Sequence, residues 1–512
     1  MAGGRVRKPV ASKLLIIAVL LATGGKITAF MKDLALSYYF GAGPDAEAYF
    51  IANVIPGLIW LAILTTIAAV FLPLYQQNRQ TSVLAAARFA QEATQLYALM
   101  AILLALFCVL LAGPIVRLTA PGAVPETRVL ARELTMIMAT GFLFTGYVGL
   151  QNAIQQSNGQ FLPPLAAPVA NNLISIAAIA LGAWAGSIHL AVVGAVFGWV
   201  VQAPVQRWRT LRYHPPRWRW QARPETVRRL STLSAPVMLG VLLDQVNIYA
   251  GVAVAGRLGP GAISHLNYGA RLSMFLATVF SWLVAYFLFP RLAAFAARGD
   301  DAGVSRTLAA GLFLIAALTL PVLIAAISQS PAFVSFVFGR GAFAAEDVTA
   351  TAAVFGVYGL GVLFIAVRDM LNRVFFSYQR TGVPLVIGAV ALAVNAVAAV
   401  WLGRVMGVVG VALAASLSAL VYAGLQFAGV AIWKPALLRF DLIRLLGAVA
   451  VAGGAGLAVA LTLGPRVAHL PDLVRLIGVG AGSGLVYLAI LAALLGVMGY
   501  RARDLSGLLS RT

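Results

Sequence analysis

Long apolar stretches follow one another along almost the whole chain of 512 residues. The composition is 61% hydrophobic and only 10% charged, with a mean hydropathy of +0.92, whereas soluble globular domains carry about 25% charged residues. A helix that crosses a bilayer needs roughly 20 apolar residues. The chain is therefore predicted to be an all-α polytopic membrane protein.

That length rule predicts fourteen transmembrane helices in the sequence. The even number of crossings places both termini on the same side of the membrane. The predicted spans lie near residues 13–40, 46–75, 90–116, 130–156, 161–183, 186–206, 229–257, 263–292, 306–338, 347–378, 382–402, 406–433, 441–463 and 474–499.

The net charge of +21 is concentrated at the ends of the predicted spans. Lys and Arg on the side that holds both termini outnumber those on the other side by about three to one, which favours cytoplasmic termini. The longest basic segment, Arg207–Arg229, interleaves arginines with tryptophans. A segment of this kind at a membrane surface binds anionic lipid headgroups, so lipid and not nucleic acid is the expected partner.

Two parts of the chain are similar to each other. The turn Gly41-Ala42-Gly43 matches Gly259-Pro260-Gly261 at an offset of 218, and the stretch from Leu150 to Pro163 matches Leu371 to Pro384 at 221. The similarity predicts two pseudo-symmetric six-helix lobes with a central site between them. The lobes would occupy residues 1–206 and 229–433, joined by a linker at 207–228, and two further helices with a tail would fill 434–512.

Seven ionisable residues lie inside the predicted spans. A charge in hydrocarbon costs at least about 2.5–3.5 kcal/mol, so it is usually retained for a ligand or a transport pathway. Four of the seven are basic, which indicates an anionic cargo. The seven are Lys26, Lys32, Asp33, Asp244, Arg271, Arg368 and Asp369.

The basic members of this group are the candidate ligands of the anion. Lys26 follows Gly24-Gly25, a pair at which the first helix could bend or unwind, and shares a helix face with Asp33. Arg271 is the strongest candidate, because a guanidinium matches the bidentate geometry of a phosphate. Its alternative role is an ion pair with Asp244.

Arg368 and Asp369 are adjacent and are predicted to lie on different faces of one helix. Asp244 and Asn395 could together form an oxygen-rich cation site in the second lobe.

The sequence contains no constellation typical of an enzyme. No catalytic triad, phosphate-binding loop or dinucleotide fingerprint occurs in a usable context, and the four histidines lack metal-ligand spacing. We therefore expect a transporter without a metal site or cofactor, coupled to Na⁺ or to the membrane potential.

Several motifs, in this order along nearly the whole chain, resemble those of the MurJ/MviN family of lipid II flippases. In that family the first helix commonly carries two arginines, the second followed by Asp, and then a Phe-Gly-x-Gly turn. Lys26, Lys32 and Asp33 occupy these positions here, and Arg271 matches the family's central-cavity arginine. The motifs are KITAFMKDLALSYYFGAGPDAEAYFIANVIP, LQNAIQQSNGQFLPPLAAPVANN, LNYGARL, RVFFSYQRTGVP and GVVGVALAASLSA.

The resemblance implies a multi-pass protein of the bacterial inner membrane that moves the peptidoglycan precursor lipid II outward by alternating access. It implies a cationic central cavity and a groove for the polyprenyl tail at the last two helices. The chain departs from the family at Trp60-Leu61, where an arginine pair is usual.

Two alternatives remain open. The cargo could be another undecaprenyl-pyrophosphate-linked oligosaccharide, of the exopolysaccharide or O-antigen type. A polytopic glycosyltransferase would also handle such lipids, but it needs catalytic carboxylates on sizeable outer loops, and the longest outer connection offers only Glu126.

Overall fold

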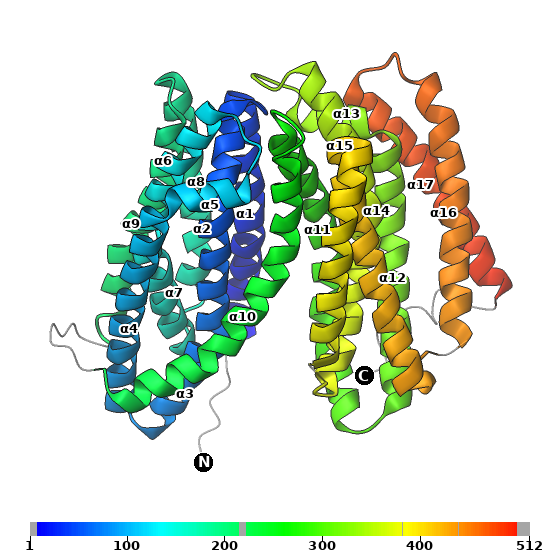
Figure 1. Cartoon of the computed structure of the whole chain (residues 1–512). Helices are drawn as coiled ribbons and strands as arrows, with labels where there is room; N and C mark the ends of the chain where they lie inside the picture. The colour runs from blue at the N-terminus through cyan, green and yellow to red at the C-terminus, as the bar shows by residue number, and fades with distance from the viewer. Residues whose placement is uncertain (1–7, 214–221, 381, 439, 499–512) are drawn as a thin grey trace. The chain divides into compact units, whose positions relative to one another are not determined.

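The computed structural model describes residues 8–213, 222–380, 382–438 and 440–498, and for a few residues within these ranges it describes the backbone only. The helices form two compact units (Figure 1). Unit 1 comprises residues 1–249 with Gly341–Phe343, and unit 2 comprises the remainder. The described residues contain helices and no strands, so the predicted all-α class is confirmed.

Unit 1 contains nine α-helices, a π-helical segment and most of a tenth helix. They are α1 (Lys8–Phe40), α2 (Pro44–Thr66), η1 (Ile67–Phe71), α3 (Leu72–Thr81), α4 (Val83–Leu110), α5 (Ala112–Thr119), α6 (Pro125–Thr140), α7 (Phe142–Ser157), α8 (Leu162–Trp184), α9 (Ile188–Thr210) and α10 (Pro224–Ala255), whose last turns belong to unit 2.

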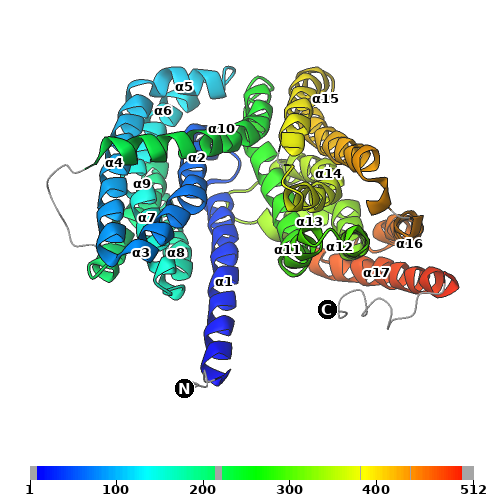
Figure 2. The same ribbon diagram turned by 90° about the horizontal axis from the view of Figure 1, so that it is seen from below.

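Unit 2 continues the chain with long helices and two short ones. They are α11 (Ala262–Ala297), α12 (Asp301–Ser328), α13 (Ser330–Phe338), α14 (Ala345–Ser377), α15 (Gly382–Trp433), the 3-10 turn η2 (Pro435–Leu437), α16 (Phe440–Arg466) and α17 (Asp472–Val497). In Figures 1 and 2, α16 and α17 lie side by side within this unit.

The helices have the length and composition of membrane spans. Ten segments of the described residues are long and apolar enough to cross a bilayer. One of them, α15, has 52 residues and contains a break at Gly407 (φ 62°, ψ −145°), which corresponds to the gap between the spans predicted at 382–402 and 406–433. Three further helices, α1, α10 and α11, coincide with predicted spans.

The two units repeat details of local structure, which confirms the predicted internal repeat. At an offset of 218, Ser82 and Asp300 are both helix N-caps whose side chains accept a hydrogen bond from the N–H three residues later, at 3.0 Å and 2.8 Å. At the same offset Gly41 and Gly259 both have positive φ, and at an offset of 221 so do Gly186 and Gly407. These residues end or begin helices. The repeat therefore includes the helix caps and turns as well as the apolar stretches.

Apolar side chains fill the interior of each unit. In unit 1 the rings of Tyr75 and Phe89 stack on Phe71, with centroids 5.7 Å and 5.6 Å away. In unit 2 the pair α16–α17 packs on α12 through a separate apolar cluster, and the Tyr487 hydroxyl donates to the Ala317 carbonyl at 3.2 Å. The two C-terminal helices are thus an addition to the six-helix pattern, as predicted.

The first part of α10 packs with unit 1. Arg229 donates to the Gln77 side chain of α3 at 2.8 Å, and Leu230 and Val237 contact the apolar core of that unit. The packing units therefore divide inside α10, after Tyr249. Packing units need not coincide with sequence repeats, so the lobe limits at 206 and 229 stay a prediction.

The break at Gly407 generates a stability test. Its φ/ψ values are open essentially only to glycine, so we expect Gly407→Ala to lower the unfolding free energy by about 1–3 kcal/mol. Gly424→Ala is the matched control, because an added Cβ meets no atom within 4 Å at either position and Gly424 lies inside the regular helix. Thermal unfolding in detergent measures both, and equal midpoints for the two variants would contradict the assignment.

Candidate functional site

The charged residues of the first helix differ in their surroundings. Lys26 is exposed, Lys32 is half-buried and Asp33 is only 8% exposed. All three lie on α1, which stays helical through Gly24-Gly25. The predicted unwinding at that pair is therefore absent from the described helix.

Polar contacts from α8 hold the helix next to Lys26. The Asn172 side-chain amide donates to the Gly25 carbonyl and to the Thr28 hydroxyl, both at 3.1 Å, and Thr28 in turn donates to the Gly24 carbonyl at 2.8 Å. The two carbonyls that precede Lys26 thus have acceptor bonds beyond those of the helix itself. Asn172 is a site-shaping residue that sequence reasoning missed, although an amide in an apolar run was the available signal.

Arg271 lies on α11 in unit 2 and is half-buried. Asn395, on α15 of the same unit, is 3% exposed. Asp244 lies on α10 in the part that packs with unit 1, and its side chain is outside the described residues. The predicted cation site of Asp244 and Asn395, and the alternative ion pair of Arg271 with Asp244, therefore stay predictions.

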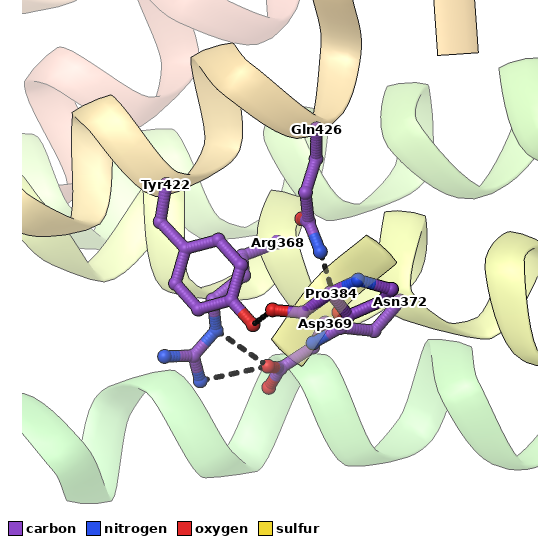
Figure 3. Close-up of polar contacts among 6 residues, drawn as sticks. All are labelled: Arg368, Asp369, Asn372, Pro384, Tyr422 and Gln426. Atoms are coloured by element: carbon purple, nitrogen blue, oxygen red, sulfur yellow. Dashed lines mark hydrogen bonds and ion pairs between the residues drawn. The ribbon is translucent and has the colours of Figure 1, made fainter. Parts of the chain in front are cut away.

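Arg368 and Asp369 of α14 form an ion pair with each other (Figure 3). The Arg368 Nε and Nη2 groups donate to Asp369 Oδ1 at 3.1 Å and 2.8 Å. The sequence did not predict this ion pair, because neighbouring residues lie on different faces of a helix. Their Cβ atoms point about 100° apart, but the long arginine side chain reaches back to the carboxylate.

The pair belongs to a polar layer between α14 and α15. The Arg368 guanidinium carbon lies 5.4 Å from the ring centroid of Tyr422, whose hydroxyl donates to the Pro384 carbonyl at 2.9 Å. The buried Gln426 amide donates to Asn372 Oδ1 one turn beyond Asp369. Arg368 and Asp369 keep 30% and 40% of their side-chain surface exposed, so Arg368 retains donors for another acceptor.

Unit 1 has a neutral counterpart of this layer between α7 and α9. Gln155 donates to Gln206 at 2.6 Å, and the Thr210 hydroxyl donates to Gln151. Gln206 and Gln426 are 220 positions apart, close to the repeat offset. Amides occupy this interface in both units, and the ion pair is an addition in unit 2.

Two charged clusters at helix ends were not anticipated from the sequence. Glu92 of α4 is 1% exposed and accepts from Arg223 at 2.7 Å. In unit 2, the Lys434 ammonium donates to both Asp301 oxygens at 2.7 Å and 2.8 Å, and the Tyr378 hydroxyl donates to the same carboxylate. Burial and the carboxylate raise the pKa of Tyr378, so its hydroxyl remains a donor at neutral pH.

In the part of the chain that the structure describes, no group of three His, Cys, Asp or Glu side chains could hold a metal ion. The fold is instead that of a transporter: many apolar helices in two repeated bundles, with charged side chains placed within spans.

A model of the family "Lipid II flippase MurJ" matches residues 36–464. The chain belongs to this family.

Curated relatives agree with that assignment. The probable lipid II flippase MurJ of Vibrio cholerae is 27% identical over 527 residues, with 96% of each chain covered, and that of Synechocystis is 25% identical over 476 residues, with 86% of each covered.

Solved structures show the same fold. A lipid II flippase MurJ in an inward closed conformation gives a TM-score of 0.81 at 20% identity, covering 94% of this chain and 99% of that one. An inward-facing multidrug resistance transporter of the MATE family, in the MOP superfamily, gives 0.69 at 14% identity, covering 83% and 99%.

The ion pair of α14 can be tested by a double-mutant cycle with Arg368→Gln and Asp369→Asn. Because both side chains are partly exposed, we expect a coupling of about 0.5–1 kcal/mol in unfolding free energy. The control cycle combines Arg368→Gln with Asp301→Asn, whose carboxylate is bound by Lys434 instead. Thermal unfolding in detergent measures both cycles, and an equally small coupling in the two would refute the pair.

Proposed function

We propose that this protein flips lipid II from the cytoplasmic to the outer leaflet by alternating access. The observation that carries the proposal is the family match over residues 36–464, combined with basic side chains inside membrane spans at positions that match the family's motifs. In this proposal Lys26, Lys32 and Arg271 bind the pyrophosphate of the cargo, and Arg368 is an additional ligand.

The physical basis is charge compensation in a poorly solvated site. A pyrophosphate leaving water needs cations and hydrogen-bond donors to replace its hydration, and guanidinium supplies both in a planar fork. Lys26 is exposed and Arg271 half-buried, so neither is sealed in a packed core. The buried Asp33 beside Lys32 would moderate the positive charge, so that the anion is bound and later released.

The membrane potential would drive the outward step. Moving one negative charge from an inside-negative compartment outward is favourable by about 2.3 kcal/mol per 100 mV. Na⁺ binding at Asp244 and Asn395 is the second component of this proposal, because a carboxylate and an amide supply the oxygen ligands that hard cations prefer.

The proposed location is the bacterial inner membrane with both termini in the cytoplasm. The basis is the three-to-one excess of Lys and Arg on that side. The basic linker at 207–228, part of which lies outside the described residues, would then rest on anionic headgroups of the inner leaflet.

A second candidate cargo is another undecaprenyl-pyrophosphate-linked oligosaccharide. The observation in its favour is Trp60-Leu61, which replaces the usual arginine pair of the family. The Trp60 ring packs edge-on to Phe142, with centroids 6.3 Å apart, and Leu61 is 42% exposed. Two apolar side chains in place of two arginines make this position less cationic, which is the reason to consider a different lipid-linked glycan. Flipping of the two labelled lipids by purified protein in vesicles would distinguish the cargoes.

Loss of Arg271 should remove the function. We expect Arg271→Ala to abolish growth rescue in a strain depleted of its own lipid II flippase, because the pyrophosphate loses its bidentate ligand. Arg306→Ala is the matched control: Arg306 is exposed near the start of α12, and its Nε donates only to the Ala302 carbonyl among the described contacts. Membrane levels of both variants are measured in parallel, and full rescue by Arg271→Ala would sink the ligand assignment.

A further inference from the structure

A tyrosine hydroxyl bonds to two backbone groups of one helix in unit 1. The Tyr97 hydroxyl of α4 donates to the Phe142 carbonyl of α7 and accepts from the Gly146 N–H at 2.9 Å. Residues 142 and 146 are the i and i+4 partners that bond directly in a regular α-helix. The hydroxyl therefore bonds to both members of a pair that bond to each other in a regular α-helix.

The Tyr97 hydroxyl can reach these two backbone groups only because residue 146 is glycine. A Cβ added there would lie 2.1 Å from the Tyr97 ring, closer than any side chain allows. Tyr97 is 6% exposed and Gly146 is buried, so the contact lies inside the unit. Side chains that enter the hydrogen-bond ladder are a recognised cause of helix kinks.

The surrounding residues make the same region irregular. The helix of the fourth span ends and restarts at Gly141, where an added Cβ would lie 2.9 Å from the Trp60 ring. One turn past Gly146, Gly149 faces Leu64 and Ile67, and Ile67 begins the π-helical segment η1 of the second span. Two irregular segments on neighbouring helices thus lie against each other.

The internal repeat supplies a natural comparison. At the offsets of 218 and 221, Tyr97 corresponds to Ile315, and Phe142 and Gly146 correspond to Leu363 and Val367. Ile315 has no hydroxyl to insert, and α14 is one continuous helix from Ala345 to Ser377. The fold therefore does not require a break at this position, and unit 1 differs from unit 2 both in the break at Gly141 and in the tyrosine next to it.

We propose that Tyr97 is a positioning residue that builds a hinge into the fourth span of unit 1. In one state its hydroxyl bridges Phe142 and Gly146, and in the other the hydroxyl withdraws and the two backbone groups bond directly. The Phe142 carbonyl and the Gly146 N–H each keep a partner in both states, so the helix can bend and straighten inside the membrane. The link to transport rests on the proposed flippase function, whereas the hydrogen-bond exchange does not.

The exchange can be followed at the Gly146 amide. The sequence has four Thr-Gly steps, ending at Gly24, Gly141, Gly146 and Gly382, so labelling Thr carbonyls with ¹³C and Gly nitrogens with ¹⁵N leaves four signals to assign. In Tyr97→Phe the direct bond to Phe142 should form, and we expect hydrogen exchange of the Gly146 amide to slow at least tenfold. Conditions are set so that the wild-type amide exchanges within hours.

Tyr147→Phe is the matched control, since it removes a hydroxyl one residue from Gly146 on the same helix and should leave this rate unchanged. Gly146→Ala, whose methyl expels the ring, is a second route to the closed ladder and should slow exchange at Tyr147 and Val148 within the repaired turn. An unchanged Gly146 rate in Tyr97→Phe overturns the insertion. A faster rate overturns the hinge, because the ladder would then stay open without the hydroxyl.

The transport consequence has a separate readout. In vesicles with labelled lipid II, Tyr97→Phe should lower the flipping rate several-fold and leave the half-saturating lipid concentration unchanged, because the hinge acts on the conformational step. A normal flipping rate overturns the role of the hinge in transport. Absence of flipping in the wild-type protein would instead refute the proposed function, and the exchange measurement would still decide the hinge.

Discussion

The need to satisfy every backbone polar group without water governs this structure. Within hydrocarbon the helix meets that need internally, so each departure from regular helix must bring its own partners. Asn172 and Thr28 supply added bonds at Gly24 and Gly25 of α1. Tyr97 supplies both a donor and an acceptor at the break between α6 and α7. At these two places, buried polar side chains are partners of backbone groups.

The charges obey the same constraint in a different way. Within a span, Arg368 is joined by Asp369 and the face of Tyr422, and at a helix end outside the spans Lys434 is joined by Asp301. Compensation of this kind permits a cation to remain in a span at low cost, yet partial exposure leaves it able to bind a second anion. A pyrophosphate that binds Arg368 would compete with Asp369, which favours reversible binding over tight capture. That balance suits a protein that must release its cargo.

The repeat shows how one pattern acquires different roles. Both units carry an amide at the same interhelical position, Gln206 and Gln426. Among the described residues, only unit 2 has an ion pair there, and only unit 1 has a break in its fourth span, next to the contact of Tyr97. Charge in one unit and irregular helix in the other are the two features that the shared architecture does not itself require.

The sequence by itself determined the class, the approximate spans and the repeat, and it named candidate residues for binding an anion. The length of an apolar stretch and the charges within it are local properties of the sequence, and they decide directly whether the stretch can cross a bilayer. Only the tertiary structure decided how those residues are paired. The adjacency of Arg368 and Asp369 suggested separate faces, but the reach of the arginine side chain joined them. Nothing in the local sequence placed Tyr97 against Gly146, because that contact depends on how α4 packs on α7, 45 or more residues away along the chain.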